Sequence, residues 1–453
     1  MQTRLLSAAL AGLLTMTGLP AVAHAEDLMD IYREAVANDP VLASADARRL
    51  VVAEGVPQAR AALLPQLSAG LSLQQFHPSY SGPDNNSNEN VPVTGIGDGH
   101  SRERDLSLSL NQTVLDLSKF ARERQAKQTE EAQEATYEGE LQDLYVRSTT
   151  AYFNVLVAQD QVEITRSYED AYKQSFDQAT TLFAQGLAPE ADLTQSRAYY
   201  LLIKSQRVDA ENTLRDARRA LQQLTGKEPG TLKTLREDLP MERPTPDTAA
   251  AWVDQAMHQN PSVIAANHLV SADEHSINAA RSGHLPTLNA AVGYDKNGQW
   301  SNAVPGRSNY GPGSTTIGLV LTVPLFSGGL IQSQVRQAIH QRDEDQSDLE
   351  SVRRQTARDT TNYFNLVVAG IGQVNDSREA VDSAKKALAS MRAGYDIGTQ
   401  SLTNVVVAIQ ILAEIRTQYT SLRHNFILNK LLLKRSVGGA ELKDIEEINR
   451  LLQ

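Results

Sequence analysis

The sequence contains no cysteine among its 453 residues. Disulfide bonds and thiol chemistry are therefore excluded, and so is a lipid attached through an N-terminal cysteine after export. Aromatic residues make up only 5% of the chain, and the formal net charge is −11. Such an acidic balance argues against a nucleic-acid partner, because phosphate backbones attract Lys and Arg.

Long apolar runs are also missing beyond the N-terminus. Residues 1–25 have the pattern of a cleavable export signal, with Arg4, the apolar stretch Leu5–Leu19 and the small-residue site Ala23–Ala25. No later run reaches the roughly 18 apolar residues of a membrane-spanning helix, so we expect none. An exported chain of this kind is periplasmic, secreted, or a β-barrel of the outer membrane.

The chain carries an internal duplication. Asp39-Pro40 returns as Asn260-Pro261, and Leu64-Pro65 returns as Leu285-Pro286, each 221 positions later. Later pairs lie at offsets of 211 and 212, namely Tyr152–Asn154 with Tyr363–Asn365 and Gly186 with Gly398. A solenoid would repeat every ~20–50 residues, so this spacing indicates two copies of one supersecondary unit. Duplicated halves of this kind build symmetric barrels and tunnels.

Each half is expected to contain two strands, because apolar and polar residues alternate there with period two. The expected strands are Gln66–Gln74, Leu106–Leu110 with its flanks, Leu288–Tyr294 and Thr316–Val323, separated by polar loops at 77–103 and 295–313. Four strands cannot close a bacterial membrane barrel, which needs at least about eight. The chain must therefore oligomerise if these strands lie in lipid.

Two segments predict very long helices. Leu117–Phe183 and Leu330–Tyr395 contain no proline and almost no glycine. A helix of about 65 residues is about 100 Å long and must lie against neighbouring helices in a coiled-coil manner. Each is followed by a glycine-containing turn and a return helix, which ends near Leu224 or Val437. A further helix is expected over 27–62, interrupted where proline follows Asp39.

These elements give an expected domain organisation. After the signal at 1–25, the first repeat covers 26–226 and the second covers 248–438. A proline-rich connector at 227–247 joins them, and the short charged tail at 439–453 is expected to be peripheral.

The ordered motifs resemble the TolC family of outer-membrane channel proteins. The residues that carry the resemblance are Leu64–Leu67 and Leu285–Leu288, Ala151–Asn154 and its second copy, Leu182–Leu187, Ala393–Thr399, and Val323–Gly329. The resemblance implies a mixed α and β fold. Long α-helical hairpins would form a periplasmic α-barrel, and four strands per chain would complete a transmembrane antiparallel β-barrel on trimerisation.

The resemblance also implies a function and partners. The homotrimer would be the outer-membrane exit duct of a tripartite export system, with a large periplasmic part. Substrates, either small molecules such as drugs or a secreted protein, would come from an inner-membrane transporter through a periplasmic adaptor. The strands would contact outer-membrane lipid. The sequence does not choose between the two substrate classes.

Two groups of residues acquire candidate roles from the resemblance. Those at the helical tips, which would contact the adaptor, are Gly186, Leu187, Gly398 and Thr399. Plain helix capping explains the two glycines equally well. Those at the periplasmic gate are Asp192, Tyr395, Gln400, Asn404 and Val407.

The gate positions depart from the family pattern. Gln400 stands where the family has arginine, and a glutamine carries no charge, so the closing link with Asp192 should be weaker. Asp192 also fits an ordinary acidic residue in a first helical turn. Asn404 and Val407 stand where the family often has two aspartates, so we expect weaker block by divalent cations.

Catalysis, metal binding and cofactors are not expected. The nine histidines are scattered without HxxxH spacing, and no nucleophile with a base beside it is recognisable. The main alternative to a duct is a periplasmic coiled-coil scaffold or adaptor. The two pairs of alternating strands argue against it, since a scaffold has no need of an apolar sheet face.

Overall fold

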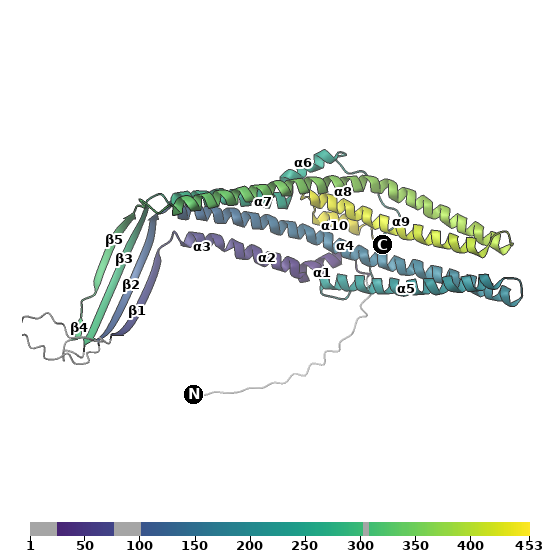
Figure 1. The fold of residues 1–453 in the computed structure, drawn as a ribbon, viewed down its shortest axis with the longest axis horizontal. Helices are drawn as coiled ribbons and strands as arrows, with labels where there is room; N and C mark the ends of the chain where they lie inside the picture. The colour runs from purple at the N-terminus through teal and green to yellow at the C-terminus, as the bar shows by residue number, and fades with distance from the viewer. Residues whose placement is uncertain (1–24, 77–100, 302–307) are drawn as a thin grey trace, which may run out of the picture.

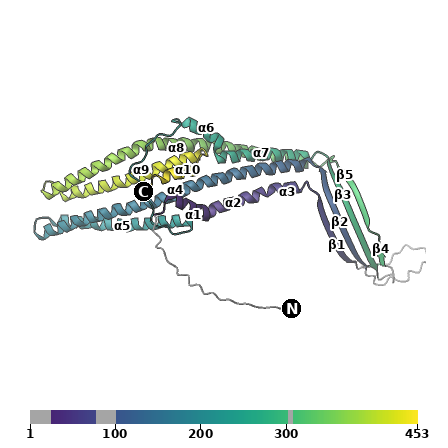
Figure 2. The same ribbon diagram turned by 180° about the vertical axis from the view of Figure 1, so that it is seen from behind.

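The computed structural model describes residues 25–76, 101–301 and 308–453, and it shows an elongated molecule with a sheet at one end (Figure 1). The expected export signal and most of the two polar loops lie outside the described residues. Helices extend from the base of the sheet to two hairpin tips at the opposite end (Figure 2).

One antiparallel sheet contains the described strands. They are β1 (Gln66–Phe76), β2 (Ser101–Leu115), β3 (Thr287–Ser301), β4 (Ser308–Tyr310) and β5 (Ser314–Thr322). The long strands lie in the order β1-β2-β3-β5, and the short β4 pairs with the far end of β3. This leaves β1 and β5 as the two long edges of the sheet, as the four-strand prediction requires.

Two very long helices run from the base of the sheet to the tips, as the sequence predicts. They are α4 (Leu117–Ala184) and α8 (Leu330–Asp396), and each turns back into a return helix, α5 (Glu190–Thr225) and α9 (Leu402–Ser436). The remaining helices are α1 (Leu28–Asn38), α2 (Pro40–Ala53), α3 (Gly55–Ala61), α6 (Ala249–Gln259), α7 (Pro261–Ser282) and α10 (Leu442–Asn449).

The shorter helices form two interrupted columns beside the long ones. On the sheet side, α2 and α3 pack on α4, and α7 packs between α4 and α8. On the tip side, α5 continues the first column and α9 continues the second (Figures 1 and 2). Hence α4 is flanked by both columns, whereas α8 is flanked by the α7–α9 column and by the short helix α6.

The repeated Asx-Pro dipeptides begin the sheet-side helix of each column. The Asp39 carboxylate accepts a hydrogen bond from the Leu42 amide at 3.0 Å, and the Asn260 side chain accepts one from the Ser262 amide at 2.9 Å. The proline that follows each one occupies the first helical position, where its missing N–H costs nothing. The predicted interruption of the first helix is thus confirmed.

The return helices end on glycines in the left-handed region. Gly226 has φ 74° and Gly438 has φ 76°. A Cβ on Gly226 would lie 3.3 Å from Asn38, and one on Gly438 would overlap the carbonyl group of Gln259. In both halves the end of the return helix therefore abuts the start of the sheet-side helix, and at Gly438 only glycine fits.

The largest core lies midway along the molecule, where α1, α4, α9 and α10 meet. Tyr152 is fully buried there, and its hydroxyl donates to the carbonyl of Lys233 at 2.7 Å. Ile31, Leu431 and Ile445 belong to the same cluster. Burying such side chains contributes about 1.5–3 kcal/mol each. This core fixes the connector and both repeats to one another.

The tail is not peripheral as expected. Its helix α10 places Ile445 and Ile448 in the central core, and Asp444 is buried beside Lys434 of α9, with which it forms an ion pair. The charged composition of the tail does not predict this packing. Two isoleucines three positions apart are nevertheless enough to make one face of a short helix apolar.

Strand β3 is longer than the sequence analysis predicts. The expected loop at 295–313 contains the second part of β3, as far as Ser301, and all of β4. Likewise β2 begins at Ser101, within the expected loop at 77–103. Polar residues are typical of loops, but in a sheet with one face in water they alternate with outward residues and leave the strand intact.

Candidate functional site

The register of the sheet gathers apolar side chains on one face. Leu67 lies opposite Leu110, which lies opposite Val292, which lies opposite Ile317. Neighbouring rows on this face hold Ala69, Leu108 and Tyr294, or Leu71 and Leu106, or Leu115, Leu288 and Leu321. Most of these side chains are exposed in the single chain. Large apolar groups in such ordered rows indicate a lipid-facing surface.

The opposite face is built from small and polar side chains. The hydroxyls of Ser68 and Ser109 lie 2.6 Å apart across β1 and β2. In the next row a Cβ on Gly70 would lie 2.8 Å from the hydroxyl of Ser107. Along the other strands this face carries Gly293 and Thr316. Alternation of this kind is the pattern of a membrane barrel strand with a water-filled interior.

The apolar face has the height of a membrane. Outward residues of β2 run from Leu115 to Leu106, a distance of about 30 Å at about 3.4 Å per residue. With a tilt of about 40°, this corresponds to a height of about 23 Å, close to the apolar band of about 25 Å in outer-membrane barrels.

The first helical tip is a Schellman turn. Gly186 has φ 74°, and its amide donates to the carbonyl of Phe183 at 2.9 Å, while the amide of Leu187 donates to that of Leu182 at 2.9 Å. This pattern satisfies the last carbonyls of α4 and requires a left-handed residue. The side chain of Leu187 is 72% exposed.

The second tip repeats the same hydrogen bonds. Gly398 has φ 78°, and its amide donates to Tyr395, while the Thr399 amide and hydroxyl both donate to the carbonyl of Gly394. Ile397 beside it is 76% exposed. Both tips therefore combine a left-handed glycine with an exposed apolar side chain. Glycine in the turn is explained by capping, but the exposed Leu187 and Ile397 are not.

The structure brings two of the predicted gate residues close to one another. Asp192 lies in the first turn of α5, and Tyr395 lies at the end of α8, in the other hairpin. Burial raises the pKa of the Tyr395 hydroxyl, and the negative charges of Asp192 and Asp396 raise it further. Asp192 is thus within electrostatic reach of Tyr395.

Of the other predicted gate residues, Gln400 lies in the turn just before α9, and Asn404 and Val407 lie on the first two turns of α9. The side-chain Nδ2 of Asn404 donates to the side-chain Oε1 of Gln400 at 2.8 Å, so these two neutral side chains pair with each other. Val407 is exposed one turn further along α9. None of the three adds a charge at this end of the molecule.

Two contacts between the two hairpins were not predicted from the sequence. The Thr403 hydroxyl of α9 donates to the Gln195 side chain of α5 at 3.4 Å. Nearby, the Tyr172 hydroxyl of α4 donates to the carbonyl of Val406 at 3.4 Å. No sequence signal marks such a pair, because neither hydroxyl nor amide is distinctive on a helix surface.

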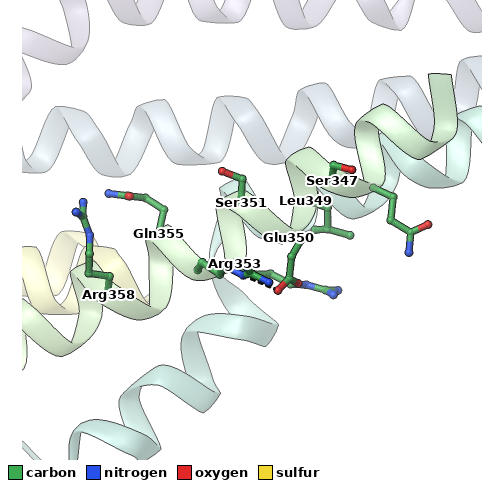
Figure 3. A pocket seen from close by; sticks show the side chains of 9 residues that line it. Ser347, Leu349, Glu350, Ser351, Arg353, Gln355 and Arg358 are labelled. Carbon is green, nitrogen blue, oxygen red and sulfur yellow. Dashed lines mark hydrogen bonds and ion pairs between the residues drawn. The ribbon is translucent and has the colours of Figure 1, made fainter. Parts of the chain in front are cut away.

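A hollow of about 710 Å³ lies along α8 (Figure 3). Its lining residues all come from this helix and are Gln346, Ser347, Leu349, Glu350, Ser351, Arg353, Arg354, Gln355 and Arg358. The hollow is a trough on a helix surface and contains no histidine to activate Ser347 or Ser351. It offers no catalytic arrangement.

The described residues contain neither a metal-binding cluster nor a membrane-spanning helix. Within 25–76, 101–301 and 308–453, no group of three or more metal-ligating side chains is placed to hold an ion. In the same part of the chain, no helix has both the length and the apolar character needed to cross a bilayer.

Comparison with known proteins decides the family. Residues 31–227 and 252–439 match the family described as outer membrane efflux protein. The chain belongs to this family. Members of the family are outer-membrane channels, which are not enzymes.

Two relatives match almost the whole length of this chain. Outer membrane protein TolC of Escherichia coli K12 is 30% identical over 447 residues, which are 97% of this chain and 87% of the relative. The proteases secretion protein PrtF of Dickeya chrysanthemi is 25% identical, over 94% of this chain and 91% of the relative.

A solved structure shows the same fold. The Campylobacter jejuni CmeC outer membrane channel superposes with a TM-score of 0.76 at 18% identity, covering 94% of this chain and 90% of that one. The expected fold class is thus confirmed, with α-helical hairpins for an α-barrel and a sheet for a β-barrel completed on trimerisation. The chain is an outer-membrane exit duct with a large periplasmic part.

Proposed function

We propose that three copies of this chain form one continuous duct, which receives substrate from an inner-membrane transporter through a periplasmic adaptor. The observation that carries the proposal is the two-faced sheet with two unpaired edges. Three sheets of four long strands give twelve strands, an even number within the range of bacterial barrels. Pairing β1 of one copy with β5 of the next would satisfy every edge.

The helices support the same assembly. By the internal repeat, α8 is the counterpart of α4. Two helical columns flank α4, whereas α8 is flanked by one column and by the short helix α6. The trough along α8 at 346–358 corresponds, at an offset of 211, to 135–147 of α4. That stretch of α4 is covered, since Gln142 donates to Gly438 at 2.9 Å and Asp143 pairs with Arg435 at 2.6 Å. The α2–α5 column of a neighbouring copy would cover α8 in the same way.

The length of the hairpins supports a passage across the periplasm. At about 1.5 Å per residue, the 68 residues of α4 extend for about 100 Å. A duct of this kind has no need of catalysis or a cofactor of its own. It acts by enclosing a path for substrate.

We assign the adaptor contact to the two tips, at Gly186, Leu187, Gly398 and Thr399. Exposed Leu187 and Ile397 lie at the far end of the molecule, where the chain has no apolar surface to cover them. Replacing Leu187 by Asp should abolish capture of the adaptor in a cross-linking assay, whereas Leu187→Met should retain it. Equal capture by both variants would contradict the assignment.

We assign the closed gate to Asp192, Tyr395, Gln400, Asn404 and Val407. Around the three-fold axis these residues would recur three times at the narrow end of the duct. Asp192 lacks a cationic partner at position 400, because the Gln400 side chain is neutral and accepts from Asn404. A neutral link is weaker than a charge-assisted one, so the gate should open more readily than one closed by arginine.

Single-channel recording in a planar lipid bilayer tests both the duct and the gate. The purified trimer should conduct in discrete steps, and Gln400→Arg should lower the conductance or the open time by pairing with Asp192. Gln410→Arg, the same substitution at an exposed position further along α9, is the matched control. No conductance in the unmodified protein would overturn the duct, and equal behaviour of the two arginine variants would overturn the gate.

The substrate class stays open between two alternatives. PrtF is a protein of protease secretion and CmeC is an outer membrane channel. Both fit a duct whose cargo is chosen by the transporter on which it docks. Recovery of the transporter with the cross-linked adaptor would distinguish a drug pump from a protein exporter.

A further inference from the structure

Four consecutive charged residues begin strand β2 with strictly alternating sign. They are Arg102, Glu103, Arg104 and Asp105. Successive side chains on a strand point to opposite faces, so both arginines lie on one face and both acids on the other. The alternation separates positive from negative charge across the thickness of the sheet.

The register assigns each sign to a face. Arg104 follows Leu106 and Leu108 on the apolar, outward face, and it lies opposite Leu73 of β1. Asp105 lies opposite Ser72 of β1, on the small polar face that lines the interior. The arginines are therefore outward residues and the acids are inward residues.

Strand β3 repeats this separation. Lys296 lies opposite Leu106 on the outward face, and Asp295 lies opposite Ser107 on the inward face. Per copy, the outward face thus gains three cationic groups and the inward face gains three acids at this end of the sheet. On the outward face of β1, β2, β3 and β5 here, the described side chains include no acid.

The cationic groups follow one another from the outer limit of the apolar band outward. Leu106 is the last apolar outward residue of β2, at the outer limit of the apolar band of about 25 Å. Lys296 pairs with it, and Arg104 and Arg102 follow one and two outward positions further on. This end of the sheet is the one remote from the periplasmic helices (Figure 1). The three residues therefore lie at the headgroup level of the outer leaflet.

Another copy of the chain does not compete for these residues. Strands β2 and β3 are the two inner strands of the sheet, flanked within the chain by β1 and β5. A neighbouring copy would join at β1 or β5, so the outward side chains of β2 and β3 would still meet lipid. The Arg102 guanidinium donates through Nε to the Gln75 side chain at 3.2 Å, which holds it on the outward face of β1.

We propose that Arg102, Arg104 and Lys296 form a cationic girdle that binds the phosphate groups of anionic lipids in the outer leaflet. Guanidinium groups match phosphate oxygens in a bidentate manner, and a lysine stem can reach the headgroups from the edge of the apolar band. Three copies would present nine cations around the barrel. The proposal rests on the outer-membrane duct described above.

Binding of a phosphorylated glycolipid to the detergent-solubilised, full-length trimer tests the girdle. A diphosphorylated lipid A is titrated and bound lipid is counted by native mass spectrometry. Replacing all three residues by Gln should raise the half-saturating concentration about 100-fold, since each cation near an anionic surface contributes roughly a factor of five. The matched control is Glu103→Gln with Asp105→Asn and Asp295→Asn, on the opposite face, which should bind like the unmodified protein.

Further arms separate the possible sources of binding. Dephosphorylated lipid A should bind weakly, and inorganic phosphate alone should not compete at equal concentration. Unchanged binding by the Gln variant, equal loss in the acid variant, or equal binding of the dephosphorylated lipid would each overturn the girdle.

If the triple variant fails to assemble, Arg102→Gln alone should still weaken binding about fivefold. Trimers that conduct but bind lipid indifferently would refute the girdle and leave the duct intact, whereas absence of trimers in the unmodified protein would refute the duct.

Discussion

At the scale of single residues, His424 shows how burial sets a charge state. Its ring is 3% exposed on α9, 5.1 Å from the ring of Phe153, and its Nδ1 lies 2.8 Å from the carbonyl of Thr420. Burial, together with the charge of Arg423, lowers the pKa of His424 to about 4, against the opposing effect of the hydrogen bond to Thr420. The folded chain therefore holds this histidine neutral.

This burial predicts a loss of stability in mild acid. Between pH values of about 6.5 and 4 the unfolded chain binds a proton that the folded chain does not, so stability falls as pH falls. The loss reaches about 3 kcal/mol per chain at the lower end. His424→Leu should make the drop in Tm from neutral to acidic pH several degrees smaller. Equal drops in the two proteins, measured by scanning calorimetry in detergent, would contradict this.

A comparison of variants is needed because another group acts with the opposite sign. Burial, together with the neighbouring Asp345 and Glu344, raises the pKa of Asp273 on α7 to about 6. The folded chain then holds a proton that the unfolded chain releases above pH 3.8. The contribution of this carboxyl group to the stability of the folded chain therefore falls as pH rises from about 4 to 6. The contribution of His424 is therefore measured as the difference between the Tm drops of the unmodified protein and of the His424→Leu variant.

At the scale of elements, two glycines with the same backbone conformation make a matched pair. Gly398 and Gly438 have φ 78° and 76°, but a Cβ on Gly398 meets nothing within 4 Å, while one on Gly438 overlaps the Gln259 carbonyl. Gly398→Ala should therefore cost only the left-handed strain of about 1–2 kcal/mol. Gly438→Ala should cost clearly more, because the junction of α9 with α7 must move.

The readout for this pair is the Tm of the trimer together with the amount of trimer recovered from membranes. We expect near-normal recovery for Gly398→Ala and a large loss for Gly438→Ala. Equal effects would mean that the junction is compliant and that backbone strain alone matters at both glycines.

The same elements show what a sequence reveals and what it hides. The long helices and their turns were predictable, because proline is absent from 117–183 and a glycine stands at each tip. The far part of β3 was not, because Asp295, Asn297 and Gln299 resemble a loop until one face of the sheet is known to be wet. The gate residues were placed from resemblance. Their mutual contacts depend on how two hairpins meet, which no local pattern encodes.

At the scale of the whole molecule, the unpaired edges of the sheet predict covalent capture of the assembly. The chain has no cysteine, so introduced thiols have no competitors. Ser68→Cys on β1, combined in turn with cysteine at Thr316, Gly318, Val320 or Thr322 on β5, should give oxidised dimers and trimers for at least one pair. All five positions lie on the inward face. The measurement is band position on a non-reducing denaturing gel.

The control for this experiment is a cysteine at Asn289, on the inward face of β3. Strand β2 separates β3 from β1 within the chain, and β5 separates it from any neighbouring copy. This cysteine should stay uncross-linked to Ser68→Cys. Monomers from every β1–β5 pair would show that the sheet edges do not meet.

The side chains on the inward face of the sheet also affect the width of the barrel lumen. Its rows consist mainly of serine, glycine, alanine and threonine, among them Ser68, Ser107, Ser109, Gly293 and Thr316. Side chains this short take up little of the lumen, so its calibre follows from strand number and tilt. The wall of the barrel therefore does little sieving by size, and selection of cargoes by size belongs to other parts of the chain or to its partners.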